Sequence, residues 1–581
     1  MTAHVSPQPE SDPQPETGAL VEADVVVVGG GPTGLAAAHF LAGHGVRTVV
    51  LEQRLTPSGH PRATVINSRT MELLRHLGID AAVRRAGVPL QNTARITWCT
   101  ELAGTELAGL DIIASADALM QRAVNSPVLP VICSQNRVEA LLVDRLPDNA
   151  RVIRGVKAEE LAPTPSGVRV TASGEGGRPL VVEARYAVLA EGLHGSLRET
   201  VGLEQTAATP LGRLLDIHFS ADLSPWTAGR ESALYWVLND TVRGVLVTVD
   251  PVDGEWLLEI PALSADEEHR YFEQEVDHHK LIEAAIGKPV DAIEGLRIHS
   301  VRNWVMGSTG LTSWRSADGR VLAAGDAAHT FPPTGGFGMN TGIQDAHNLA
   351  WKLAAVLRGN ATDALLDSYE RERRPVAEFN ARHSETNALQ KRALLQSDAD
   401  PEFARNIEEH RPHFDFEGQT LGFSYEPGPG ESVVQDVVNY RPTAQAGHRA
   451  PHAWLDRDGD RISSIDLART GFALLTGPGG AVWRQVAQET ATVAGLPLTA
   501  TVIGTAGSTA ADTAADGPQL RDVNGAFADS YALRGAEAVL VRPDGHVLAR
   551  LPGVAPRQEL AQAVDRIVTT GLMPARAEVL S

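Results

Sequence analysis

The chain has 581 residues and a mass of 61.8 kDa, a length that accommodates three or four domains at roughly 150 residues per domain. Hydrophobic residues make up 43% of it and charged residues 21%, which is typical of a globular protein and excludes fibrous, collagen-like and wholly disordered classes. Acidic residues outnumber basic ones by 72 to 51, a net charge of -21, so we expect no nucleic-acid or membrane partner.

A strand, a helix and a second strand are predicted at the start of the folded part. Residues 1–22 are rich in Pro and Glu and lack the basic start and apolar core of a signal peptide, so we expect a disordered tail. Residues 23–28 (ADVVVV) are continuously apolar, as in a strand buried on both faces of a parallel sheet. A glycine-rich turn, a helix over 35–44 and a strand over 46–51 complete a βαβ unit.

The middle of the chain alternates between helical and strand patterns. Residues 68–77 and 136–146 predict helices, and 152–171 with 180–189 predict antiparallel strands that lead to a turn at Gly192. Residues 214–260 are rich in strand formers and aromatic side chains, which indicates a mixed or antiparallel sheet. A helix over 271–286, a short buried strand over 320–324, and long helices over 342–357 and 361–384 follow, the last kinked at Pro375.

The pattern changes after residue 395. Residues 395–445 have no clear period, and PGPGE at 427–431 marks a loop or boundary. Short strands over 472–476, 498–503 and 538–542 and a closing helix over 558–568 predict a further domain. Residues 504–517 are low-complexity Ala, Thr and Ser, which we expect to form a mobile surface loop.

Residues 29–34 (GGGPTG) form a G-x-G-x-x-G motif between the first strand and the first helix. Gly29 permits the tight turn, Gly31 lets a pyrophosphate approach the backbone, and Gly34 allows close packing of helix on strand. Glu52 ends the second strand, near the offset at which a carboxylate accepts hydrogen bonds from ribose hydroxyls. The motif predicts a dinucleotide site and leaves open whether the ligand is FAD or NAD(P).

A second motif, GDAAH at residues 325–329, follows the predicted strand over 320–324 and leads to PPTGGFGMN at 332–340. Asp326 is a carboxylate at the end of a strand, and the glycines expose backbone N–H groups at the start of a helix. An acid for a sugar-alcohol chain and donors for an anionic ring edge are what a flavin needs.

Together, and in this order, the two motifs resemble those of the group A FAD-dependent aromatic monooxygenases, the family of para-hydroxybenzoate hydroxylase and phenol hydroxylase. HPRA at 60–63, NSRTMELL at 67–74, QNRVE at 135–139, GIQDA at 342–346 and RERRP at 371–375 also resemble that family. The resemblance covers roughly residues 23–390. GHRAPH at 447–452 and AVLVRPDG at 538–545 resemble the thioredoxin-like domain of phenol hydroxylase, although the CxxC motif is missing.

The resemblance implies an α/β fold with a Rossmann-like FAD-binding domain, a mixed β-sheet substrate domain and a C-terminal thioredoxin-like α/β domain. The expected division is a tail at 1–22, the FAD-binding domain at 23–205 and 301–395, the substrate sheet at 206–300, a linker at 396–445 and the thioredoxin-like domain at 446–575. The only two cysteines, Cys99 and Cys133, lie outside the last domain, so thiol redox chemistry there is excluded and a scaffolding or oligomer-contact role is expected.

By the same resemblance, the ADP part of FAD is held by the first motif and its neighbours, namely Gly29, Gly31, Pro32, Thr33, Gly34, Glu52 and Gln53. Arg62 and Gln135 contact the phosphate or ribityl region, and Asp326 binds the ribityl chain. The carbonyl of Pro333 lies near the reactive edge of the ring, so Arg62 and Pro333 are the candidate catalytic positions. Backbone N–H groups at Gly338, Met339 and Asn340 face the pyrimidine end of the flavin.

One motif departs from the family pattern D-G-x-x-S-x-[VL]-R. This chain has EGLHGSLR at 191–198, so that Glu191 replaces the acid with a longer one and Gly195 stands at the serine position. Arg198 is retained. We expect FAD binding to survive this change, whereas the contacts to the nicotinamide cofactor are the ones it puts in question.

Candidate substrate residues lie on the predicted sheet: Tyr235, Trp236 and Trp256 could line an aromatic pocket or simply fill the core. Arg213, His218 and Arg297 could orient a phenolate. No metal site is expected, because His278 and His279 are helical neighbours that point about 100° apart.

The predicted function is hydroxylation of a phenolic or polycyclic, polyketide-like aromatic substrate through a flavin hydroperoxide, with FAD, transiently bound NADPH or NADH, and O2. Two alternatives stay open: a Baeyer–Villiger oxygenation of a ketone on the same scaffold, and a flavin- or ligand-binding protein without hydroxylase activity. We expect a cytoplasmic protein of specialised metabolism, for which a homo-oligomer is compatible with the sequence.

Overall fold

The computed structural model describes residues 20–112, 116–174, 177, 179–396, 403, 407, 414–505 and 519–571. Most of the expected disordered tail therefore lies outside the described residues, as do most of the expected loop at 504–517 and part of the expected linker at 396–445. The prediction of a disordered tail is wrong at its end, because strand β1 (Leu20–Glu22) pairs in parallel with β11 (Pro179–Ala184).

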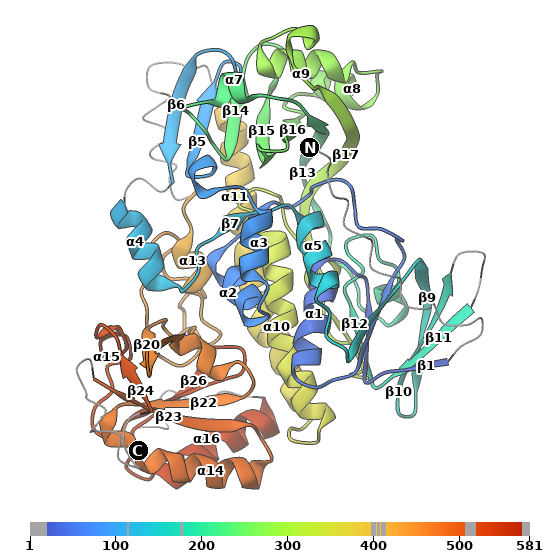
Figure 1. Cartoon of the computed structure of the whole chain (residues 1–581). Coiled ribbons are helices and arrows are strands. Elements are labelled where there is room, and N and C mark those ends of the chain that lie inside the picture. The colour runs from blue at the N-terminus through green and yellow to red at the C-terminus, as the bar shows by residue number, and fades with distance from the viewer. Residues whose placement is uncertain are drawn as a thin grey trace, which may run out of the picture.

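A five-stranded parallel sheet lies in the middle of the molecule, with the strand order β18-β12-β2-β3-β8 (Figure 1). Its strands are β2 (Val25–Val28), β3 (Thr48–Glu52), β8 (Ala150–Arg154), β12 (Tyr186–Leu189) and β18 (Val321–Ala323). Every residue of β2, β3 and β12 is buried, as the continuous apolar sequence of β2 predicts for that strand. The predicted βαβ unit is confirmed. The antiparallel prediction is wrong for β8 and β12, which pair in parallel within this sheet.

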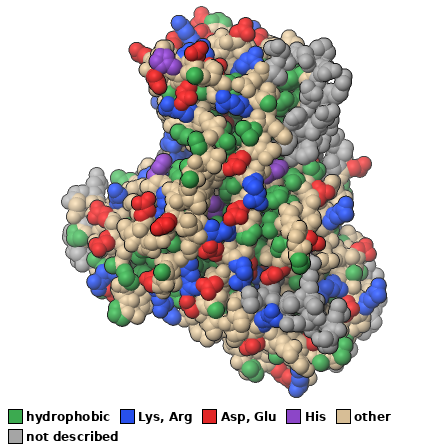
Figure 2. Space-filling model, turned by 180° about the vertical axis from the view of Figure 1, so that it is seen from behind, with side chains coloured by type: hydrophobic (Ala, Val, Ile, Leu, Met, Phe, Trp, Pro, Cys, Tyr) green, Lys and Arg blue, Asp and Glu red, His purple; other side chains and the backbone are tan. Residues whose placement is uncertain are grey.

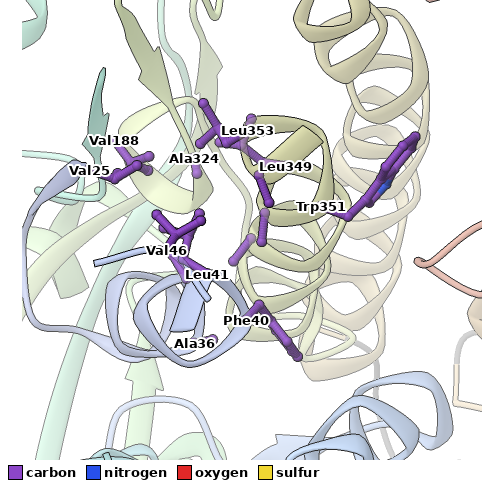
Figure 3. Packing of buried hydrophobic residues seen from close by; sticks show 14 of the residues in the cluster. Val25, Ala36, Phe40, Leu41, Val46, Val188, Ala324, Leu349, Trp351 and Leu353 are labelled. Atoms are coloured by element: carbon purple, nitrogen blue, oxygen red, sulfur yellow. The ribbon is translucent and has the colours of Figure 1, made fainter. Parts of the chain in front are cut away.

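Helices α1 (Pro32–Gly43) and α10 (Phe337–Leu357) pack together against this sheet. Figure 3 shows Phe40 and Leu41 of α1 on the side that faces α10, and Trp351 on the opposite side of α10. The ring of Trp351 instead meets Phe472 of the C-terminal domain, with ring centroids 5.8 Å apart. Both helices begin earlier than predicted. Helix α11 (Ala364–Gln396) contains Pro375 in its interior and ends twelve residues after its predicted end at residue 384.

Smaller elements surround this sheet. A four-stranded sheet has the order β1-β11-β10-β9, and β4 pairs with β7. These elements are β4 (Val65–Ile66), β7 (Val131–Ile132), β9 (Val156–Thr164), β10 (Gly167–Gly174), α2 (Ser68–His76), α3 (Asp80–Ala86), α4 (Ala116–Asn125), α5 (Gln135–Asp144) and α6 (Leu197–Thr200).

The expected substrate sheet is an eight-stranded mixed sheet with the order β19-β17-β13-β16-β15-β14-β5-β6. Its strands are β5 (Arg95–Cys99), β6 (Glu106–Asp111), β13 (Thr209–Ser220), β14 (Leu234–Leu238), β15 (Arg243–Asp250), β16 (Glu255–Pro261), β17 (Arg297–Gly310) and β19 (His329–Thr330). Strands β5 and β6 come from the range 23–205 and β17 runs past residue 300, so this sheet extends beyond the range 206–300 on both sides.

Helices α7 (Ser224–Thr227), α8 (Ala265–Phe272) and α9 (His278–Ile286) belong to the same part of the chain (Figure 1). The single helix predicted over 271–286 is wrong. Asp277 starts a new helix there, because its side chain accepts hydrogen bonds from the backbone N–H groups of His279 and Lys280.

The C-terminal domain contains the strand order expected of a thioredoxin-like fold. In its sheet, β21-β20-β24-β23-β22-β25-β26, strands β22 and β23 are parallel and flank α14, while β25 and β26 form an antiparallel pair before α16. Its elements are α13 (Glu417–Leu421), which precedes the sheet, β20 (Trp454–Arg457), β21 (Asp460–Ser463), β22 (Phe472–Thr476), α14 (Val482–Ala494), β23 (Leu498–Gly504), β24 (Leu520–Asp522), α15 (Ala526–Tyr531), β25 (Ala538–Val541), β26 (Val547–Leu551) and α16 (Pro556–Thr570).

Fully buried ion pairs join this domain to helices α10 and α11. Arg542 donates to both carboxylate oxygens of Glu372, at 2.7 and 2.8 Å, and also pairs with Asp544. Lys352 donates to Glu372 at 2.7 Å. Removing one member of such a set leaves a buried charge without its partner, so the complete set is needed where the C-terminal domain meets helices α10 and α11.

Among the described residues, no helix is both long and apolar enough to cross a membrane. Figure 2 shows charged side chains of both signs spread over the rear face of the molecule.

Candidate active site

The first glycine motif forms a turn in which neighbouring atoms leave no space for a side chain at Gly29 and Gly34. A Cβ on Gly29, which has a φ of +108°, would lie 2.2 Å from the carbonyl oxygen of Ala190, and one on Gly34 would lie 1.9 Å from that of Gly29. A Cβ on Gly31 would meet nothing within 4 Å, so the backbone is open to a ligand there. Helix α1 then begins at Pro32 with no side chain capping it, which leaves its first N–H groups for an anion.

Glu52 holds this turn from the end of β3. Its Oε2 accepts a hydrogen bond from the backbone N–H of Gly30 at 2.7 Å, and its Oε1 accepts one from the backbone N–H of Arg54 at 2.8 Å. The carboxylate is buried, whereas the neighbouring Gln53 is exposed. Glu52 therefore stands beside the open backbone at Gly31, where the motif predicts a nucleotide.

The second motif contacts the first through Thr33. A Cβ on Gly325 would lie 2.5 Å from Oγ1 of Thr33, and one on Gly342 would lie 2.2 Å from the same atom. Gly325 also has a φ of +60°. The two glycine-bearing turns, far apart in sequence, are therefore packed side by side around one threonine.

Asp326 lies directly after Gly325 and is exposed to solvent. Enough protein nevertheless surrounds it that burial raises the pKa of its carboxyl, an effect that the charges of His329 and Arg62 oppose. A side chain that is open to solvent and yet surrounded by protein lines a deep part of the structure, as a residue at a ligand site does.

The loop that carries Arg62 approaches the same place. Arg62 is exposed and has a φ of +49°, in the left-handed region that disfavours residues with a Cβ; such strain is concentrated at functional sites. Gln135, the first residue of α5, fixes the loop because its backbone N–H donates to the carbonyl of Ala63 at 2.8 Å. Its side chain donates to Glu139, also at 2.8 Å.

The turn before α10 presents a second open helix start. The carbonyl of the exposed Pro333 accepts a hydrogen bond from the N–H of Gly336 at 2.9 Å, and no side chain caps the helix. In a helix that begins at Phe337, the N–H groups of residues 337–339 have no carbonyl one turn earlier. Gly338 and Met339 therefore offer free backbone donors.

The side chain of Asn340 has a structural task, since it is buried and donates to the carbonyls of Val65 and Gly336 at 2.9 and 2.6 Å. Its oxygen accepts the N–H of Asn67 at 3.0 Å. Its backbone N–H is the first that the helix itself can pair. The expectation of a ligand contact is therefore weaker for Asn340 than for Met339.

Glu191 fills the space left by the glycine that replaces the family's serine. Its carboxylate accepts hydrogen bonds from the backbone N–H groups of Leu197 and Arg198, at 3.3 and 3.1 Å, at the start of α6. A Cβ on Gly195 would lie 2.0 Å from both Cγ and Cδ of Glu191. The longer acid and the missing side chain are therefore one combined change.

The eight-stranded sheet has an outer face, packed under α8 and α9, and an inner face. The structure does not group the predicted substrate residues. Tyr235 and Trp256 belong to the apolar cluster of the outer face and find their hydrogen-bond partners there. Arg213 pairs with Glu268 of α8 at 3.7 Å. Alternation along the strands turns Arg213, Tyr235 and Trp256 to the outer face, and their role as substrate residues stays a prediction.

Trp236 and His218 are on the inner face, with the apolar cluster of Trp98 and Leu257. Sequence reasoning missed Asp216, which is two residues from His218 on β13 and so shares its face. It also missed His60, whose Nε2 is 3.9 Å from Oδ2 of Asp216. The period-two pattern of residues 214–219 would have placed Asp216 and His218 together, whereas nothing local to residue 60 indicates its neighbour.

Within the part of the chain that the structure describes, no group of three or more His, Cys, Asp or Glu side chains is arranged to hold a metal ion. The fold and the site define a flavin-dinucleotide-binding α/β protein with two open helix starts and an acid, Asp326, that follows strand β18. The residues fit FAD, since the backbone is open at Gly31 and donors are free at Met339.

Comparisons with known proteins agree with this description. The FAD binding domain family matches residues 22–384, and the aromatic-ring hydroxylase C-terminal domain matches residues 443–570. The tetracenomycin A2 monooxygenase-dioxygenase of Streptomyces glaucescens is 35% identical, covering 94% of this chain and 97% of the relative.

Two solved structures each cover 94% of this chain and 99% of their own. The flavin-dependent monooxygenase PieE in complex with FAD and substrate has a TM-score of 0.82 at 28% identity. The ternary complex of aklavinone-11 hydroxylase with FAD and aklavinone has a TM-score of 0.80 at 29% identity.

The chain belongs to the FAD-dependent aromatic-ring monooxygenases, the family that its two glycine motifs resemble. FAD as the cofactor, the monooxygenase class and the three-part α/β fold are thereby confirmed.

Proposed function

We propose that the protein hydroxylates a ring carbon of a phenolic or polycyclic aromatic compound, at the expense of NAD(P)H and O2. The observation that carries this proposal is the contact of Thr33 with Gly325 and Gly342, because it brings the two glycine motifs side by side. The aromatic substrates named for the tetracenomycin and aklavinone relatives support a polycyclic ligand.

The ADP part of FAD would bind at the first turn. The pyrophosphate would lie on the open backbone at Gly31, where the start of α1 stabilises negative charge. Glu52 would accept from ribose hydroxyls while it holds the N–H of Gly30. Pro32 fixes the first helical φ without needing a partner for an N–H, and Gln53 is exposed alongside.

The flavin end would bind between Arg62, Asp326 and the start of α10. Asp326 would accept from the ribityl hydroxyls, and the cation of Arg62 would lie near the phosphates or the ring. The free N–H groups at Gly338 and Met339 would stabilise negative charge on the pyrimidine, and the carbonyl of Pro333 would lie at the reactive edge. When bound, the flavin takes electrons from NAD(P)H and delivers one atom of O2 to the substrate.

The test uses the purified holoprotein with a set of hydroxylated aromatic compounds. We expect NAD(P)H oxidation to accelerate when an aromatic ligand binds, and a hydroxylated product that carries isotope label from O2. Label that enters from water, or ligand binding without faster flavin reduction, would overturn the proposal. A ring-expanded ester as product would instead identify a Baeyer–Villiger oxygenase.

We also propose that the protein acts in the cytoplasm and that the aromatic substrate and the reductant are its main partners. The absence of a membrane-spanning helix among the described residues is compatible with this. We further expect a homo-oligomer, and sedimentation of the full chain would detect it.

A further inference from the structure

Polar side chains gather on the inner face of the eight-stranded sheet. We call the buried His60, Asp216 and His218, together with the half-buried Trp304, the inner-face cluster. Along β13, Leu215 and Ile217 point to the outer apolar core, so Asp216 and His218 point inward. Strand β17 is next to β13, and its Trp304 donates a hydrogen bond from Nε1 to Oδ2 of Asp216 at 2.6 Å.

Much of the hydrogen-bonding capacity of this cluster is unused. Asp216, His218 and His60 are 6%, 5% and 3% exposed. Nevertheless Oδ1 of Asp216, both ring nitrogens of His218 and Nε2 of His60 have no hydrogen-bond partner among the described residues. A buried polar atom without a hydrogen bond is unfavourable, so four such atoms in one place indicate a site for a polar ligand group.

The cluster is also next to the proposed flavin site. His60 is two residues from Arg62 on the same loop, and its Nδ1 is 2.9 Å from Oγ of Ser300 on β17, so the loop is tied to the sheet. The charge of Arg62 acts both on His60 and on Asp326. A ligand in contact with the inner-face cluster would therefore lie between the sheet and the flavin-binding loop.

Charged groups from four elements surround Asp216. Glu259 of β16 is its cross-strand neighbour, and Lys391 of α11 faces Glu259. Arg302 of β17 is paired with Asp216 in the sheet register, and His60 approaches from the loop. Burial raises the pKa of Asp216 to about 7, against the hydrogen bond from Trp304 and the charge of Arg302.

The neighbours of Asp216 have different protonation behaviour. Burial and the charge of Asp216 raise the pKa of Glu259 to about 8. Burial lowers the pKa of both His60 and His218 to about 4, so both rings are neutral at pH 7. Near neutral pH, the pair Asp216 and Glu259 thus exchanges protons, whereas the two histidines act as neutral hydrogen-bonding groups.

We propose that the inner-face cluster binds a ring hydroxyl of the aromatic substrate and that Asp216 accepts its proton. This inference rests on the proposed hydroxylase function. The O–H bond of the substrate breaks, the proton joins Oδ1 of Asp216, and the electron pair stays on the substrate oxygen. No electrons are transferred and no further reactant is needed. The resulting phenolate is richer in electrons at the ring carbons next to and opposite the oxygen, which favours attack by an electrophilic oxygen.

The proposal specifies the substrate as a compound with a phenolic hydroxyl. It also makes a ketone without such a hydroxyl a poor ligand, which distinguishes hydroxylation from the Baeyer–Villiger alternative. His60 and His218 would hold the same hydroxyl or a neighbouring oxygen through their free nitrogens.

The test measures ionisation of a bound phenol by the FAD-loaded protein. Umbelliferone is a suitable probe, because the absorbance of this bicyclic phenol moves to longer wavelength when its hydroxyl ionises. In the unsubstituted protein, we expect the bound dye to ionise at a lower pH than the free dye. In Asp216→Asn, which keeps the size of the side chain, we expect at least tenfold weaker binding at pH 8 and a dye that stays neutral.

The matched control is Glu259→Gln, which removes a carboxyl from the adjacent strand. Because this variant leaves the Asp216 carboxyl in place on the neighbouring strand, it should keep the shifted ionisation. If the dye ionises equally in Asp216→Asn, or if both variants lose the shift alike, the assignment to Asp216 is overturned. Failure of the unsubstituted protein to bind umbelliferone and other phenols would refute the proposed function itself.

Discussion

Replacing Gly195 by serine should loosen the turn that follows β12. The added Cβ would lie 2.0 Å from Cγ and Cδ of Glu191, so the Glu191 side chain would have to move. Its carboxylate would then lose the hydrogen bonds from the N–H groups of Leu197 and Arg198. Hydrogen bonds to charged groups contribute ~1.5–3 kcal/mol each, and because this carboxylate is half-buried and both bonds are long, we expect a total loss of about 1–2 kcal/mol.

A double-mutant cycle isolates the cause. Glu191→Asp shortens the acid and weakens the same bonds, but it also leaves room for a side chain at position 195. The two losses should therefore not add: we expect Glu191→Asp with Gly195→Ser to be less destabilised than the sum by about 1 kcal/mol. Urea unfolding followed by flavin fluorescence, which rises when FAD leaves, measures each corner. Strictly additive losses would refute the steric account.

Three further predictions concern the buried charges, the first glycine motif and acid stability. Arg542→Met should lower the free energy of unfolding by about 3–5 kcal/mol in urea titrations, because Glu372 would stay buried without its main cation. Gly34→Ala should yield protein without bound FAD, seen as loss of the yellow absorbance, because its Cβ would lie 1.9 Å from the carbonyl of Gly29. Burial lowers the pKa of His76 from 6.5 to about 3, so the unfolded state binds this proton first and stability should fall as the pH drops below 6.5, measured as the urea midpoint against pH.

The two substitutions each have a control in the chain. Arg557 forms an exposed ion pair with Glu489, and Arg557→Met should change stability by less than about 0.5 kcal/mol. Gly43 is in the same helix as Gly34 but has open space around it, so Gly43→Ala should keep FAD. Equal effects in a variant and its control would contradict the structural reasoning, as would a urea midpoint that stays constant between pH 6.5 and 4.

The candidate FAD site was largely predictable because its residues are consecutive. Gly29, Gly31 and Gly34 follow a buried strand, and Asp326 follows another, so the local sequence contains both the element and the site. The free donors at Met339 were predictable for the same reason. Asn340 was not, because its side-chain partners Val65 and Asn67 come from a distant segment.

The substrate side was much less predictable. Aromatic composition directed attention to Tyr235 and Trp256, but strand alternation turns them to the outer core. Asp216 looks like an ordinary charged residue in sequence. Its significance appears only when β17 brings Trp304 and the loop brings His60 to it.

Glycine spacing and a continuous apolar strand in the amino-acid sequence determined the dinucleotide site and the βαβ unit, and the resemblance of the sequence motifs to a known family indicated FAD and the three-part α/β fold. Only the tertiary structure decided which face of the eight-stranded sheet is turned to the flavin-binding loop, and how Glu191 and Gly195 compensate each other. The physical reason is that the orientation of a face, and the space that one side chain leaves for another, depend on strands and loops that meet only in the folded chain. No local sequence pattern encodes which of these segments will be neighbours.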